Sequence, residues 1–168
     1  MFNRVFLTLL LFAAFSLTFA GQNEDSNLSL MKQFYSEVAN QGNYDVINKL
    51  VSDQFVEHET LPEPNFTPNR DGVKQFFTMM RTAFPDLNFH VEFMFSKDDK
   101  VVTYLTMTGT QKGEFMGFPA SGKKFNTTGI DIVRFADGKA VEHWGVTDSI
   151  TMMQQLGAIP QKAGAMSD

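Results

Sequence analysis

Two acidic residues and the only tryptophan of the chain occur together near its end. Glu142, Trp144 and Asp148 lie within one short stretch. A carboxyl group that a large aromatic side chain shields from water has a raised pKa, because its charged form loses hydration. Such a group can take a proton from a carbon next to a carbonyl group and return it elsewhere. These residue types therefore predict an acid–base site centred on Asp148.

The elements that must position these residues are a β-hairpin and a short helix. Asp137 and Gly138 separate two alternating runs, which is a strong signal for a two-residue turn. Alternation along the second strand places Glu142 and Trp144 on one face and His143 on the other. We therefore expect Glu142 beside Trp144 in a pocket, and His143 at the surface.

The same residues also have ordinary structural interpretations. Asp148 precedes Ser149, where a helix is predicted to begin, and is suited to cap that helix. Trp144 could be an ordinary core residue, and His58 could be a partly buried histidine without a role in chemistry. The acid–base hypothesis therefore depends on Asp148 lying in a dry cavity.

The first twenty residues are typical of a secretory signal peptide. Arg4 precedes an apolar run over residues 5–15, and Thr18 and Ala20 are small residues at the spacing of a cleavage site. The run is shorter than the roughly 20 residues of a membrane-spanning helix. We therefore predict a secreted or periplasmic protein, cleaved near Ala20, without stable membrane insertion afterwards.

The composition excludes several classes of function. The full chain has 168 residues, a net charge of −5 and no cysteine. Loss of residues 1–20, which contain one basic residue and no acid, makes the mature chain more negative still. An acidic chain without a basic cluster is a poor partner for nucleic acid. Without cysteine there is no thiol nucleophile or thiolate metal site, and no histidine spacing typical of a metal site occurs.

The rest of the chain predicts helices followed by strands. Apolar residues recur at helical spacing over residues 27–41, 44–51 and 71–84, and alternate over 87–95, 101–110, 125–135 and 139–146. The strands are joined by short links, which favour antiparallel neighbours. We therefore predict an α+β domain with a mostly antiparallel sheet of about four to six strands, packed against three N-terminal helices.

The domain boundaries follow from the same patterns. Residues 21–26 are polar and predict a flexible mature N-terminus, and residues 158–168 predict a loose tail. One domain over residues 27–157 remains, which is long enough to bury its own core.

Several fragments, in this order, resemble those of one protein family. They are FVEHE at residues 55–59, RTAFPDLNF at 81–89, TGTQKGEFMGFPASGKKF at 108–125, GIDIVRFADGK at 129–139, and VEHWGVTD with QQLG between 141 and 157. Together they are similar to the SnoaL-like polyketide cyclases, also called ester cyclases, of the NTF2-like superfamily. The resemblance extends over nearly the whole mature chain.

The resemblance implies a cone-shaped α+β domain with an apolar cavity between a curved sheet and the helices. Family members of known reaction close a ring by an aldol condensation without a metal or an organic cofactor. An aspartate shortly after the EHW strand is their acid and base, and by position it corresponds to Asp148. His58 matches a histidine of the family that lines the pocket. Many relatives carry histidine at the position of Gln111, and a homodimer through the open sheet face is also implied.

These observations give one set of candidate residues and two functions. The candidate catalytic residues are Asp148 and His58, and the candidate substrate-binding residues are Trp144, Glu142, Gln111, Phe115, Phe118 and Arg134, with no metal ligand. The first function is cofactor-independent acid–base chemistry on a small hydrophobic carbonyl compound, as in a cyclase, isomerase or lyase. The second is a secreted binding protein that holds an apolar ligand without chemistry. Polar groups that converge in the cavity would favour the enzyme.

Overall fold

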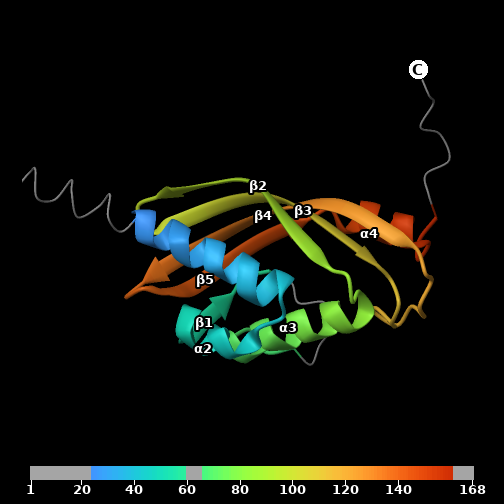
Figure 1. Ribbon diagram of the computed structural model, residues 1–168, viewed down its shortest axis with the longest axis horizontal. Coiled ribbons are helices and arrows are strands. Elements are labelled where there is room, and N and C mark those ends of the chain that lie inside the picture. Colours follow the sequence, from blue (N-terminus) through green and yellow to red (C-terminus); the bar gives the residue numbers. More distant parts are fainter. Residues whose placement is uncertain (1–23, 60–65, 161–168) are drawn as a thin grey trace, which may run out of the picture.

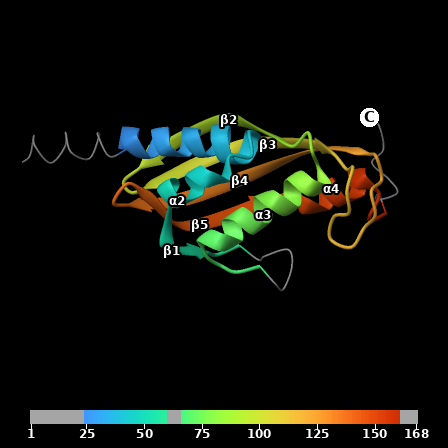
Figure 2. The same cartoon turned by 60° about the horizontal axis from the view of Figure 1, so that its bottom comes forward.

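The computed structural model describes residues 24–59 and 66–160 of the chain (Figure 1). They form a curved five-stranded sheet with the first helix, α2 and α3 against one face, as Figures 1 and 2 show. The α+β architecture predicted from the sequence is thereby confirmed. The predicted signal peptide, residues 1–20, and residues 161–168 of the predicted tail lie outside the described part of the chain.

A long first helix begins the described chain. Residues 24–33 are α-helical, and the helix continues as a π-helical segment, η1, over Phe34–Asn40. Residues 24–26 are therefore helical, although the sequence predicted a flexible N-terminus there. The predicted end near residue 41 is confirmed, and Gly42 follows with a φ of +70°, a conformation that costs glycine little.

Three further helical segments follow the first helix along the chain. A single 3₁₀ turn, η2 (Tyr44–Val46), leads into the short helix α2 (Ile47–Leu50). Helix α3 spans Arg70–Ala83, and the side chain of Asn69 caps it by accepting hydrogen bonds from two backbone N–H groups of the first turn. The buried face of α3 closes the core beneath the sheet.

The sheet has the strand order β1-β5-β4-β3-β2. Its strands are β1 (Val51–Glu57), β2 (Asn88–Lys97), β3 (Lys100–Thr110), β4 (Lys124–Ala136) and β5 (Lys139–Thr147). β1 runs parallel to β5, whereas the other neighbouring pairs are antiparallel, so the predicted sheet type is confirmed. Helix α4 (Ser149–Leu156) follows β5 and packs against β4.

A bulge in β5 decides which of its side chains face the helices. Arg134 pairs with Glu142, but the next residue, Phe135, pairs with Ala140, so Val141 is an extra residue in β5. One extra residue turns all the following side chains to the opposite face. As a result Ala140 and His143 both face the helices.

The opposite face of the sheet, here called the outer face, carries two rows of apolar side chains. Cross-strand pairing aligns them as Trp144, Ile132, Val102 and Phe95 in one row, and Val146, Ile130, Tyr104 and Phe93 in the other. Val146 is 75 % exposed and Phe93 is 56 % exposed. Within the described ranges, no helix is long and apolar enough to cross a membrane.

Candidate active site

A cavity of about 140 Å³ lies between the helices and the inner face of the sheet. Its wall is mostly apolar because the first helix, α3 and the inner face of the sheet all contribute hydrocarbon side chains. The apolar wall includes Met31, Phe34, Phe55, Phe76, Phe77, Phe89, Leu105, Met107, Val133 and Phe135. The pattern of buried residues in the sequence thus creates a site for an apolar ligand.

One part of the cavity wall is polar. Tyr35 from η1, Glu57 from β1, Asp131 from β4 and His143 from β5 all line it. The hydroxyl group of Tyr35 donates to Asp131 Oδ2 at 2.5 Å, and His143 Nε2 lies 3.3 Å from Asp131 Oδ1. His143 Nδ1 lies 2.8 Å from Glu57 Oε2. Four elements thus meet in one hydrogen-bonded chain, in the order Tyr35, Asp131, His143, Glu57.

The surroundings of His143 favour its protonated form. Burial alone would lower the pKa of its imidazole, but the hydrogen bonds and charges of Asp131 and Glu57 outweigh burial and raise the pKa to about 10. Each ring nitrogen then carries a proton and donates it to a carboxylate. His143 is therefore an imidazolium at neutral pH, held between two acidic side chains at the polar part of a mostly apolar cavity.

Tyr35 is neutral in this arrangement. Burial raises the pKa of its hydroxyl group well above 10.0, and the charge of Asp131 raises it further. The phenol therefore keeps its proton and donates it to Asp131.

Glu59 adds a third carboxyl group at the cavity wall. Glu59 as a residue is exposed, but partial burial of its carboxyl group raises the pKa, and repulsion from Glu57 and Asp131 adds to the rise, although the positive charge of His143 opposes it. Its backbone N–H donates to Glu57 Oε1 at 2.9 Å. Within the described ranges, its carboxyl oxygens accept no hydrogen bond.

Three of these side chains lie close enough together to suggest a cation site. One ligand atom from each of Glu57, Glu59 and His143 lies within 4.8 Å of the others. A histidine binds a metal ion only through an unprotonated ring nitrogen, however, and both ring nitrogens of His143 face carboxylates. The contacts therefore favour an imidazolium over a metal ligand.

Asp148 does not line this cavity. It caps α4 by accepting a hydrogen bond from the backbone N–H of Thr151 at 3.0 Å, and its side chain is exposed. That hydrogen bond holds the pKa of Asp148 below its usual value. The prediction of a buried Asp148 with a raised pKa is therefore wrong, and the capping interpretation is confirmed.

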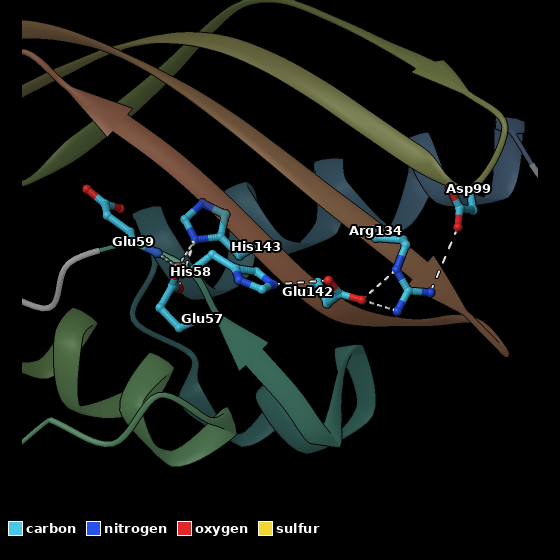
Figure 3. A network of polar contacts seen from close by, with 7 residues as sticks. All are labelled: Glu57, His58, Glu59, Asp99, Arg134, Glu142 and His143. Carbon is cyan, nitrogen blue, oxygen red and sulfur yellow. Dashed lines mark hydrogen bonds and ion pairs between the residues drawn. The ribbon is translucent and has the colours of Figure 1, made fainter.

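Four other predicted residues meet on the outer face instead, of which His58, Glu142 and Arg134 are drawn in Figure 3. The ring of His58 stacks on Trp144, with centroids 4.5 Å apart, and its Nε2 lies 3.0 Å from Glu142 Oε2. Arg134 Nε donates to Glu142 at 2.8 Å, and these partners lower the pKa of Glu142. The predicted neighbourhood of Glu142 and Trp144 is confirmed, but their placement in the pocket is wrong because of the bulge at Val141.

Gln111, Phe115 and Phe118 shape the loop between β3 and β4. Gln111 is buried and donates to the carbonyl groups of Phe118 and Pro119 at 3.2 and 3.1 Å. Phe115 packs edge-on against Phe84, with ring centroids 5.0 Å apart. None of the three lines the cavity, so their contacts fit a structural role rather than the predicted substrate contact.

The residues that do line the polar wall were not among the candidates. Tyr35 fits the apolar spacing of the helix predicted over residues 27–41, so the sequence pattern does not single it out. Alternation along a strand could have found the three acids. Glu57 and Glu59 follow the buried Phe55 at every second position, and Asp131 lies two positions before the buried Val133 in GIDIVRF. An acid in an inward-facing row is unusual enough to mark a site.

Comparison with known proteins agrees with this architecture. A family model described as SnoaL-like polyketide cyclase matches residues 29–156. TsrD from Streptomyces laurentii is similar in structure, with a TM-score of 0.72, 27 % identity and coverage of 80 % of this chain and 97 % of TsrD. No curated protein sequence matched the chain.

Two further solved structures are similar. IdmH from Streptomyces antibioticus, described as a candidate polyketide cyclase, has a TM-score of 0.67 and 31 % identity, and the match covers 78 % of this chain and 98 % of IdmH. AclR from Streptomyces galilaeus, described as a candidate hydroxylase, has a TM-score of 0.72 and 28 % identity, and the match covers 83 % of this chain and 86 % of AclR.

Proposed function

The chain belongs to the SnoaL-like polyketide cyclase family, and we propose that it catalyses proton transfer on a small carbonyl compound bound in the cavity. One observation carries this proposal: a histidine, two acidic side chains and a tyrosine converge at one part of a cavity whose wall is mostly hydrocarbon. Converging polar groups of this kind are expected of an enzyme rather than of a carrier. The proposed reaction class is enolisation, which begins aldol, isomerase and lyase reactions alike.

The charges in the cavity fit enolisation. Removing a proton from the carbon next to a carbonyl group places negative charge on the carbonyl oxygen. A fixed positive charge near that oxygen stabilises it, and His143 supplies one that acts by its charge, because both of its ring N–H groups already donate to Asp131 and Glu57. Asp131 and Glu57 hold the imidazolium in place, and Tyr35 fixes the orientation of Asp131.

The size of the cavity limits the ligand. Apolar cavities of roughly 150 Å³ hold a molecule such as benzene, and this cavity measures about 140 Å³. We therefore propose a ligand of about one ring, or a short branched chain, with one carbonyl group. Its hydrocarbon part would contact the phenylalanine-rich wall.

Hydrogen exchange on a probe ketone tests this function. Cyclohexanone in D₂O exchanges the hydrogens next to its carbonyl group only by enolisation, which NMR follows directly. We expect the wild-type protein to accelerate exchange above the buffer rate, and Asp131→Asn to reduce the acceleration at least tenfold. Asp99→Asn, a change to an exposed acid outside the cavity, is the matched control and should keep the activity.

The mostly apolar wall also favours a second candidate, a carrier without chemistry. In that case cyclohexanone or a related apolar compound would bind, seen as shifted side-chain resonances of the cavity, while its hydrogens would not exchange faster than in buffer. That pair of results would contradict the proposed reaction and support the carrier.

We also propose export and self-association, each from a separate observation. The pattern of residues 1–20 supports a secreted or periplasmic protein, and recovery of a mature chain that begins near Gly21 would test it.

The two apolar rows of the outer face support a homodimer, because monomers rarely expose so many large apolar side chains together.

A further inference from the structure

We propose that Glu59 is the group that exchanges a proton with the bound ligand, and that Gly145 positions it. This inference rests on the proposed function, since it assigns a residue to that same reaction.

The other titratable groups of the polar wall are occupied by one another. Asp131 accepts from Tyr35 with one carboxylate oxygen and from His143 with the other. Both oxygens of Glu57 lie 2.8–2.9 Å from His143 Nδ1. To act as a base, either acid would have to give up a charge-assisted hydrogen bond. They are better suited to hold the imidazolium than to accept a proton from a ligand.

Glu59 differs from them because its carboxyl group lines the cavity and, among the residues that the structure describes, has no such partner, although the residue as a whole is exposed. Its Oε2 lies 2.6 Å from the point where a Cβ atom on Gly145 would stand, so the carboxyl group reaches over β5 beside His143. Figure 3 shows Glu59 close to Glu57 and His143 at this end of the strand. Burial and the two neighbouring acids raise its pKa, which makes it a stronger base than an ordinary carboxylate.

Gly145 provides the space for this placement. It pairs with Asp131 in the β4–β5 ladder, on the face of the sheet that contributes to the cavity. A Cβ atom there would also lie 2.9 Å from His143 Cε1. Because two hydrogen bonds hold the imidazole, while the Glu59 carboxyl group ends a flexible side chain, a methyl group at this position would displace Glu59. Gly145 is thus a positioning residue for Glu59.

The proton balance of the step is simple. The carboxylate of Glu59 takes a proton from the carbon next to the carbonyl group, the C–H bond breaks, and its electron pair moves onto the carbonyl oxygen as an enolate. The positive charge of His143 stabilises the enolate. Protonated Glu59 then returns the proton, or a solvent deuteron, to the carbon.

The position of Glu59 is tested by NMR without any ligand. Titration of carboxyl carbons, with Glu59→Gln to assign the signal, should give a pKa above the ordinary glutamate value of 4.5 in the wild type. In Gly145→Ala it should return toward the ordinary value. Gly129→Ala is the matched control, since a Cβ there meets only ordinary contacts at 3.4–3.5 Å. An ordinary pKa in the wild type, or no change in Gly145→Ala, would overturn the positioning.

The role of Glu59 is tested by the cyclohexanone exchange. We expect Glu59→Gln to lower the accelerated rate at least tenfold, Gly145→Ala to lower it similarly, and the double variant to be no slower than Glu59→Gln alone. Full activity of Glu59→Gln, with loss in Asp131→Asn, would overturn this inference and leave the proposed function standing. Absence of exchange with the wild type would overturn the proposed function itself.

Discussion

His143 and Trp144 are neighbours in β5, yet His143 lies in the cavity between two carboxylates whereas Trp144 stacks on His58 on the outer face. The two side chains therefore belong to different environments with different chemistry. His143 takes part in a mostly buried network of charges. Trp144 belongs to an apolar surface bordered by the half-buried ion pair of Glu142 and Arg134.

The raised pKa of His143 predicts a particular pH dependence of stability. Its pKa is about 10 in the folded chain and about 6.5 in the unfolded chain, so the folded state binds the proton more tightly. The resulting stabilisation is complete below pH 6.5 and is lost as pH rises toward 10, by about 1.4 kcal/mol per pH unit. Urea unfolding between pH 6.5 and 9 should show this decline in the wild type.

Removal of the imidazole should flatten that profile. We expect His143→Asn to be less stable at pH 6.5 but to lose little further stability up to pH 9. His90→Asn, a change to an exposed strand residue, should keep the wild-type decline. Equal slopes for all three proteins would contradict the assignment of the charge to His143.

Filling the cavity should abolish ligand binding. Val73 on α3 lines the cavity, and Val73→Trp adds roughly the volume of one ring. We expect the affinity for cyclohexanone, measured by NMR titration, to fall at least tenfold. Ile150→Trp, on the exposed face of α4, should bind as the wild type does. Unchanged binding in Val73→Trp would place the ligand elsewhere.

Asp148 should affect stability and not turnover. Asp148→Ala removes the acceptor for the Thr151 N–H, so we expect a melting temperature lower by a few degrees with cyclohexanone exchange unchanged. Asp148→Asn keeps a capping oxygen and should restore the stability. If Asp148→Asn instead stopped exchange in a folded protein, Asp148 would regain the acid–base role that its sequence position suggested.

The outer face should hold two copies of the chain together. Ile130 and Val146 pair directly across β4 and β5 within the apolar rows. We expect the double change Ile130→Lys and Val146→Lys to convert a dimer to a monomer in light scattering coupled to gel filtration. Thr106→Lys, on the same face beyond the apolar rows, should remain dimeric. A wild-type protein that is monomeric at high concentration would contradict the dimer.

The sequence by itself determined the order and type of the elements. Alternating and helical spacing of apolar residues placed the helices and strands close to their observed bounds, because side-chain burial repeats with the period of the backbone. The Asp137-Gly138 turn and the cap at Asp148 were also readable, since both depend on local backbone chemistry. The resemblance of ordered fragments identified the family.

Only the tertiary structure decided which polar residues meet. Tyr35 and Asp131 are 96 positions apart in the chain, and Glu57 and His143 are 86 apart, so no local pattern connects them. The bulge at Val141 exchanged the faces of β5, which moved His143 into the cavity and Trp144 out of it. A single extra residue in a ladder depends on how two strands pair, and that pairing is set by contacts distant in sequence.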